Sequence, residues 1–154
     1  MVYLNDHIAD FDWEKALPLL SEQRREQTLK FKYELGRKTC AGAYLLLCEA
    51  LRKEYGIMEP PVFEYGEHGK PYIVGHPDIH FNISHCKEAV LCVTSPRPVG
   101  VDVEFIRLWT MKEAVLKLTG EGISKDLKTV LTGKEQVQTI VNMEKNYIYS
   151  IIYG

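Results

Sequence analysis

Apolar residues recur with two different periods along the chain, and the change between them separates a helical part from an extended part. Over residues 35–55 the spacing is three and four, which predicts one long helix that ends at Gly56. Ser21 is a suitable N-cap for a shorter helix that precedes it. After Pro60-Pro61 the apolar residues recur at every second position, which is typical of strands.

The expected strands follow one another closely. They lie at residues 79–84, 89–94 and 99–104, and two more lie around 136–141 and 147–153. Because short turns join the first three, we expect neighbours to pair antiparallel. A turn at 67–71 is expected between two extended segments, and a helix is expected at 108–118. This order indicates an α+β fold with helices packed on a largely antiparallel sheet. A two-lobed version of this fold would divide near Pro96 to Pro98, into halves 1–97 and 98–154.

Composition narrows the class of protein. The 154-residue chain has a formal net charge of −2, which argues against nucleic acid as a partner, since that binding depends on a large positive field. No apolar run approaches the roughly 18 residues of a membrane span, and residues 1–20 do not resemble a signal peptide. The cysteines Cys40, Cys48, Cys86 and Cys92 lack a Cys-x-x-Cys spacing, which favours free thiols over a disulfide or zinc site. We therefore expect a cytoplasmic protein that is not bound to a membrane.

Asp102 and Glu104 form the first candidate site. They are two residues apart on an expected strand, so their side chains share one face while Val101 and Val103 point toward the core. Adjacent carboxylates repel each other, and a cation such as Mg²⁺ would relieve that repulsion. For an Asp-x-Glu pair taken alone, an edge strand with a solvated polar face is the more common explanation.

The expected helix at 108–118 carries a second candidate pair. Glu113 and Lys117 are four residues apart, so they lie on one helical face, opposite an apolar stripe. Taken alone, such a pair is an ordinary surface ion pair. A second apolar flank, formed by Trp109 and Leu116, disfavours a solvated helix surface.

Residues suited to phosphate form a third group. An apolar strand ends in Ser84 and His85, and Lys70 follows a glycine in the turn before it. A hydroxyl, an imidazole and an ammonium group can all bind phosphate, although a lone histidine is more often structural. The basic residues between Arg24 and Lys38 are most simply explained as a solvated helix face.

Four motifs occur together in a fixed order: Gly69-Lys70-Pro71, Phe81-Asn82-Ile83-Ser84-His85, Gly100-Val101-Asp102-Val103-Glu104 and Trp109-Thr110-Met111-Lys112-Glu113-Ala114. Together they closely resemble the 4′-phosphopantetheinyl transferases of the Sfp type. The resemblance implies a pseudo-twofold pair of α+β halves with the active site between them. It also implies transfer of the phosphopantetheine arm of coenzyme A to a serine of an apo acyl or peptidyl carrier protein.

The resemblance also implies roles for individual residues. Asp102, Glu104 and Glu113 match the Mg²⁺ ligands, and Glu113 is the expected general base toward the carrier serine. Lys117 matches the lysine that neutralises the departing phosphate. Lys70, Ser84, His85 and Lys112 are expected to hold coenzyme A, with Lys30 and Arg37 as candidates for the 3′-phosphate.

The chain departs from the family between the last two motifs. Residues 105–108 alone separate them, whereas the family has a few dozen residues there that help to engage the carrier protein. Either the chain lacks a segment between Arg107 and Leu108, or the segment is not shown in the sequence, and the intact flanking motifs favour the second. The alternative function is therefore a non-catalytic module that binds coenzyme A or a carrier protein. A pseudo-dimeric chain has little need to self-associate, so we expect a monomer.

Overall fold

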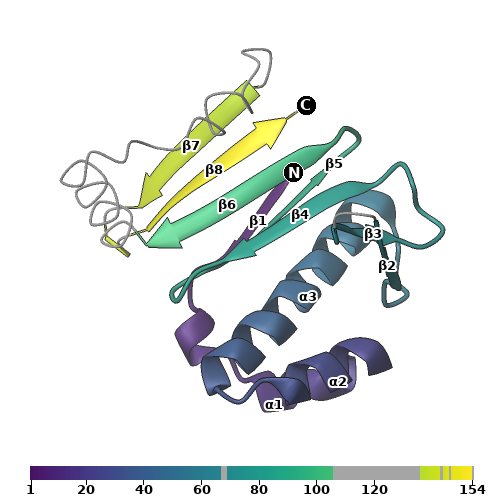
Figure 1. Cartoon of the computed structure of the whole chain (residues 1–154), viewed down its shortest axis with the longest axis vertical. Coiled ribbons are helices and arrows are strands. Elements are labelled where there is room, and N and C mark those ends of the chain that lie inside the picture. Colours follow the sequence, from purple (N-terminus) through teal and green to yellow (C-terminus); the bar gives the residue numbers. More distant parts are fainter. Residues whose placement is uncertain (67–68, 106–135, 143, 146, 154) are drawn as a thin grey trace.

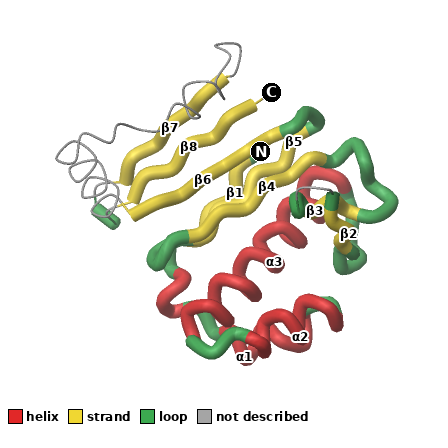
Figure 2. The backbone as a smooth tube through the Cα atoms, in the orientation of Figure 1, coloured by secondary structure: helices red, strands yellow, loops and turns green. Residues whose placement is uncertain are grey.

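The computed structural model describes residues 1–66, 69–105, 136–142, 144–145 and 147–153. After a first strand, helices come early in the chain and strands follow them (Figures 1 and 2). The elements are β1 (Val2–Asn5), the 3-10 helix η1 (Ile8–Asp10), α1 (Trp13–Ala16), the 3-10 helix η2 (Leu17–Leu19), α2 (Glu22–Lys30), α3 (Glu34–Tyr55), β2 (Phe63–Tyr65), β3 (Pro71–Ile73), β4 (His80–His85), β5 (Val90–Ser95), β6 (Val99–Phe105), β7 (Gln136–Asn142) and β8 (Tyr147–Tyr153). The predicted α+β class with antiparallel sheets is confirmed.

Both helices expected in the first part of the chain are confirmed. Ser21 caps α2, because its Oγ accepts a hydrogen bond from the backbone nitrogen of Arg24 at 3.3 Å. Gly56 ends α3 with a φ of +69°, in the left-handed region that favours glycine. The apolar face of α3 is buried as expected, and Tyr44 and Leu47 on it are fully inaccessible to solvent.

The first three-stranded sheet has the order β1-β5-β4, with both pairs antiparallel. The central strand β5 is buried along its whole length, and its alternate side chains face opposite ways. Val90 and Cys92 belong to the same core cluster as Tyr44 of α3. Leu91 and Val93 instead pack with residues of β6 and β8. The sheet is therefore covered by α3 on one face and by the C-terminal strands on the other.

The expected antiparallel pairing of the strand at 89–94 with the strand at 99–104 is wrong. β6 pairs with β8 and lies beside β4 (Figure 1), and it contacts β5 through packed side chains without pairing with it. Both edges of β5 are already occupied by β1 and β4. The short connection also contains Pro96 and Pro98, which have no backbone N–H to continue a ladder. The chain therefore crosses to the free edge of β4.

The second sheet has the order β6-β8-β7 and is antiparallel, and its last two strands agree with those expected near 136–141 and 147–153. Its buried residues include Val103 of β6 together with Tyr147 and Ile151 of β8. Val103 and Tyr147 pack against Leu91 of β5, which joins the two sheets into one core. The last sheet thus brings β6 to a fixed place beside β4.

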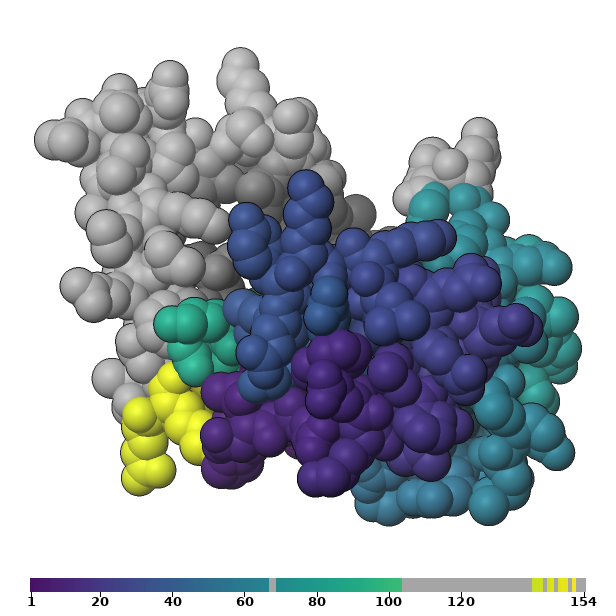
Figure 3. Space-filling view, turned by 90° about the horizontal axis from the view of Figure 1, so that it is seen from below, coloured from purple at the N-terminus to yellow at the C-terminus, as the bar shows by residue number. Residues whose placement is uncertain are grey.

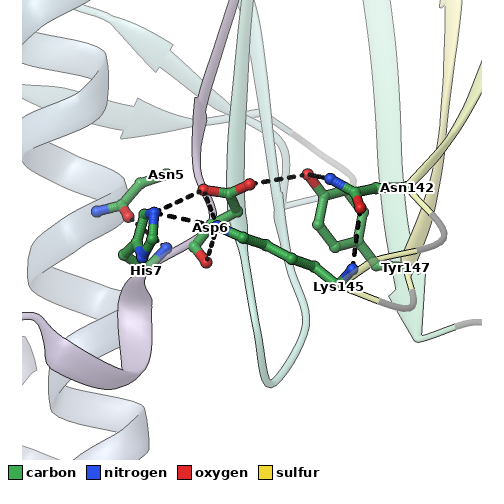
Figure 4. Close-up of polar contacts among 6 residues, drawn as sticks. All are labelled: Asn5, Asp6, His7, Asn142, Lys145 and Tyr147. Carbon is green, nitrogen blue, oxygen red and sulfur yellow. Dashed lines mark hydrogen bonds and ion pairs between the residues drawn. The ribbon is translucent and has the colours of Figure 1, made fainter.

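A separate polar contact joins the beginning of the chain to the turn between β7 and β8. Lys145 Nζ lies 2.9 Å from Asp6 Oδ1 and 3.0 Å from His7 Nε2 (Figure 4). The hydroxyl of Tyr147 donates to Asp6 Oδ2 at 3.3 Å, and Asn142 Nδ2 donates to that hydroxyl at 3.3 Å. Figure 3 shows the yellow C-terminal atoms against the purple N-terminal atoms on this face.

The four cysteines are free thiols, as expected. In the described part of the chain, no helix is long and apolar enough to cross a membrane. The helix expected at 108–118 and the junction of Arg107 with Leu108 lie outside the described residues.

Candidate functional site at the seam between β4 and β6

Side chains of β4 hold the neighbouring strand β6 by its backbone. Asn82 Oδ1 accepts a hydrogen bond from the backbone nitrogen of Val101 at 2.9 Å, and Ser84 Oγ accepts one from that of Val103 at 3.1 Å. The two acceptors are two residues apart on β4, and the two donors are two residues apart on β6, so each pair lies on one side of its strand. The residue numbers increase in the same direction on both strands, from Asn82 and Val101 to Ser84 and Val103, so the strands run parallel. Their seam is built from side chain to backbone contacts.

Asp102 lies between the two anchored positions of β6. Its carboxylate is exposed, whereas the next residue, Val103, is 2% exposed, which is the alternation expected for this strand. The hydroxyl of Ser84 donates to Asp102 Oδ1 at 2.8 Å. The structure therefore brings the Ser-His motif and the Asp-x-Glu motif into direct contact. Glu104 belongs to the same strand, and its side chain lies outside the described residues.

A cleft of about 280 Å³ lies between helices α2 and α3 and the strands β2, β3 and β4. His85, at the exposed end of β4, contributes to its lining. The cleft also contains a cation, Arg24, whose guanidinium carbon lies 5.3 Å from the ring centre of Tyr44 and 5.2 Å from that of Phe63. The remaining lining residues are Gln27, Phe31, Thr39, Cys40, Ala43, Phe63, Tyr65, Pro71, Phe81, Asn82 and Ile83. Flat apolar walls beside a cation and an imidazole suit an anionic ligand that contains a planar ring.

Lys70 reaches the seam from the β2–β3 hairpin. It follows Gly69, whose φ of +74° requires the conformational freedom of glycine. Lys70 Nζ donates to the backbone oxygen of Val99, the first residue of β6, at 3.0 Å. It also lines a second cavity of about 280 Å³, which shares Pro71 and Phe81 with the cleft at His85.

The two looser candidates lie elsewhere. Lys30 is the exposed last residue of α2. Arg37 Nε donates to the backbone oxygen of Phe31 at 3.0 Å, and its guanidinium carbon lies 4.9 Å from the ring centre of Trp13. Arg37 lines a different cavity, of about 690 Å³, between η1, α1 and the start of α3. The structure does not bring it to the cleft that holds His85.

Arg24 is the cation that the sequence left unassigned. The signal for it was weak, because α2 is polar on most of its surface. Arg24 lies four residues before Thr28, whose hydroxyl donates to the backbone oxygen of Arg24 at 2.8 Å and which is fully buried. The two residues share the helical face that packs on α3, so this spacing is the feature that marks Arg24 as inward-facing.

Three predicted site residues, Lys112, Glu113 and Lys117, lie outside the described residues. Within the described part, no three His, Cys, Asp or Glu side chains are grouped closely enough to hold a metal ion. Asp102 is exposed, and the side-chain partner that the described residues give it is the neutral hydroxyl of Ser84. A carboxylate in such surroundings is an oxygen donor that fits Mg²⁺.

Comparison with known proteins places these residues in a family. The sequence model of the 4′-phosphopantetheinyl transferase superfamily matches residues 76–151, which contain β4, β6 and β8. Residues 76–151 carry a domain of the 4′-phosphopantetheinyl transferase superfamily. The resemblance predicted from the four motifs is confirmed, and the relatives that the chain matches over 82% of its length are named as transferases.

Named relatives of this transferase come from bacteria. A 4′-phosphopantetheinyl transferase of Bacillus subtilis is 28% identical over 162 residues, which cover 82% of this chain and 71% of the relative. The transferase psf-1 of Bacillus pumilus is 29% identical and covers 82% of the chain and 69% of the relative. The transferase gsp of Aneurinibacillus migulanus is 31% identical over 62% of the chain and 56% of the relative. The first alignment is longer than the chain itself, so it includes positions of the relative with no counterpart here.

Proposed function

We propose that this protein transfers the 4′-phosphopantetheine group of coenzyme A to a serine of an apo acyl or peptidyl carrier protein, with Mg²⁺ as the cofactor. The observation that carries the proposal is the 2.8 Å hydrogen bond from Ser84 to Asp102, since it joins two of the four family motifs at one place. The family match supports the class of reaction.

The cleft at His85 supports coenzyme A as the donor substrate. Arg24 and His85 offer positive charge and hydrogen bonds to a phosphate, and the aromatic walls offer a surface for a purine ring. Lys70 lies next to this cleft and retains two further N–H groups beyond the one given to Val99. The cleft and Asp102 lie along the same strand pair, so one extended ligand can contact both.

In the proposed reaction, the carrier serine oxygen bonds to the phosphorus that carries pantetheine. The bond from this phosphorus to the oxygen that bridges to the adenosine phosphate breaks, and adenosine 3′,5′-bisphosphate leaves. The serine proton goes to a base, for which the resemblance assigns Glu113. It also assigns Glu104 and Glu113 as further metal ligands beside Asp102. Lys112 and Lys117 are assigned as cations near the phosphates. Bound Mg²⁺ would neutralise the charge of the diphosphate.

The same proposal includes the domain organisation of the enzyme, its location in the cell and its partner. The chain would be two α+β halves, 1–97 and 98–154, related by a pseudo-twofold axis. Each half contributes a three-stranded antiparallel sheet with a central last strand, β5 in one and β8 in the other, which supports this division. We expect a cytoplasmic monomer whose macromolecular partner is the carrier protein.

The decisive experiment follows the mass of a carrier protein. Incubating the chain with coenzyme A, Mg²⁺ and an apo carrier should add one phosphopantetheine group, and a chelator should stop the reaction until Mg²⁺ is restored. Asp102→Asn should slow the transfer about 100-fold or more, because a bound metal ion stabilises this kind of transition state by several kcal/mol. Asp78→Asn, in the exposed turn before β4, is the matched control and should leave the rate unchanged.

Two outcomes contradict the proposal. A chain that binds coenzyme A but modifies none of several carrier proteins is the non-catalytic binding module. Transfer by Asp102→Asn at the rate of the unchanged protein removes Asp102 from the metal site.

A further inference from the structure

The contact between Ser84 and Asp102 fixes where the proton of the Ser84 hydroxyl goes. Ser84 Oγ accepts from the backbone nitrogen of Val103 at 3.1 Å and donates to Asp102 Oδ1 at 2.8 Å. A serine hydroxyl has one proton to donate. The proton is therefore committed to the carboxylate, and the hydroxyl is not free to donate to a phosphate at the same time.

The hydrogen bond that the Ser84 hydroxyl accepts from Val103 is also fixed in position. Val103 is 2% exposed, it packs in the core with Tyr147, and its strand is paired with β8 along its length. Its backbone N–H therefore points at Ser84 from a rigid position. Asn82 holds Val101 in the same manner one step earlier on β6, at 2.9 Å. These contacts hold the backbone on both sides of Asp102, and Ser84 holds one oxygen of its carboxylate.

The geometry points to Ser84 as a positioning residue that orients the carboxylate of Asp102 toward a divalent cation, with Asn82 fixing the strand on which Asp102 lies. The inference rests on the proposed function, because it takes Asp102 as a metal ligand. It differs from the role implied by the resemblance, in which Ser84 holds a phosphate of coenzyme A. With Oδ1 held by Ser84, the other oxygen, Oδ2, is the one presented to a metal ion.

The test measures Mn²⁺ binding by the loss of the free-ion signal in electron paramagnetic resonance, with no coenzyme A and no carrier protein present. Ser84→Ala should weaken Mn²⁺ binding about tenfold, the smaller of the effects usual for residues that orient metal ligands. Ser84→Thr keeps the hydroxyl and should restore binding to within about twofold. In the transfer assay, Ser84→Ala should raise the Mg²⁺ concentration needed for half the maximal rate more than it lowers kcat.

Ser95→Ala is the matched control. Ser95 is 5% exposed, and its Oγ accepts from a backbone nitrogen, that of Arg97, at 3.1 Å, so this variant loses the same kind of hydrogen bond away from the carboxylate. It should leave Mn²⁺ affinity unchanged. A thermal melt of each variant separates loss of folding from loss of metal binding.

Three results overturn the inference. Unchanged Mn²⁺ affinity in Ser84→Ala shows that the hydroxyl does not orient the ligand. Weakened coenzyme A binding in a chelator, with Mn²⁺ binding intact, shows that Ser84 serves a phosphate. If the unchanged protein binds no Mn²⁺ at all, the positioning role and the metal assignment both fail, whereas a mass gain on the carrier protein would still support the transferase.

Discussion

Cys48 lies on α3 and Cys92 on β5, and both belong to the N-terminal core. Burial raises the pKa of the Cys48 thiol to about 11 and that of Cys92 to about 12. The thiolate is the reactive form, and at pH 8 it would amount to roughly one part in a thousand for Cys48 and less for Cys92. These two thiols are structural groups of the core.

Alkylation should therefore leave both thiols intact in the folded protein. After treatment with iodoacetamide at pH 8, peptide masses should show Cys48 and Cys92 unmodified. Both should react readily in urea, where an exposed thiol has its ordinary pKa near 8.5. Rapid labelling of Cys92 under native conditions would show that β5 opens to solvent or that its thiol is not shielded.

The sequence alone predicts the orientation of some site residues but not the surroundings of others. The alternation on β6 predicts that Val103 is buried and that Asp102 faces outward, and the structure confirms both, because a strand period of two depends on local geometry alone. The place of Arg24 depends instead on Tyr44 and Phe63, which are distant in sequence. The local spacing from Thr28 can place Arg24 on the inward face of α2, but it cannot show which aromatic rings the guanidinium meets.

At the scale of elements, the strands after α3 and the two main helices, α2 and α3, were predicted from periodicity and capping. The strand β1 and the neighbours of β6 were not predicted. Short turns suggest that consecutive strands pair, and this holds for β4 and β5. It fails for β5 and β6, because β1, the first strand of the chain, occupies the edge of β5 that β6 would need. The side chains of Asn82 and Ser84 then form the contact with β6, which no pairing rule anticipates.

The contact between Asp6 and Lys145 joins the end of β1 to the β7–β8 turn, and its contribution to stability can be measured. The hydrogen bond from Lys145 lowers the pKa of Asp6 below its usual value of 3.8. A carboxyl with a lowered pKa in the folded state stabilises the protein above its unfolded pKa, and this contribution disappears as pH falls through the folded pKa. The contribution of such a partly exposed pair is about 1 kcal/mol or less.

Asp6→Asn should thus lower the free energy of unfolding at pH 7, and the difference from the unchanged protein should shrink steadily below pH 4. Urea titrations at several pH values measure this difference. Asp10→Asn, at an exposed aspartate in η1, is the control and should show little effect. A deficit in Asp6→Asn that is the same at pH 3 and pH 7 would mean that packing, not charge, accounts for it.

At the scale of the whole molecule, the candidate site depends on parts that are far apart in sequence. The cleft needs Arg24 from α2, Thr39 from α3 and His85 from β4, and it lies beside the seam that carries Asp102. The four motifs predict which residues take part on the strands, because each motif is local. They do not predict the helical wall, since that wall forms only when α2 and α3 pack on the sheet.

The cleft makes a specific prediction about coenzyme A. If Arg24 neutralises a phosphate there, Arg24→Gln should weaken coenzyme A binding about 10- to 100-fold, the value of a hydrogen bond to a charged group. Isothermal titration calorimetry measures this directly, and a thermal melt checks for the roughly 1 kcal/mol of stability lost with the contacts to Tyr44 and Phe63. Arg25→Gln is the matched control, because Arg25 is exposed and its Nε donates to the backbone oxygen of Leu17.

The same titrations with 3′-dephospho-coenzyme A identify which phosphate is involved. If Arg24 contacts the 3′-phosphate, the unchanged protein should bind the dephospho form weakly, and Arg24→Gln should cause little further loss, because the variant and the missing phosphate remove the same contact. If Arg24 contacts the diphosphate, the variant should weaken binding of both ligands by the same factor. Equal affinity of Arg24→Gln and the unchanged protein for coenzyme A itself would show that the nucleotide does not occupy this cleft, and the ligand would then have to lie nearer Lys70, in the neighbouring cavity that shares Pro71 and Phe81.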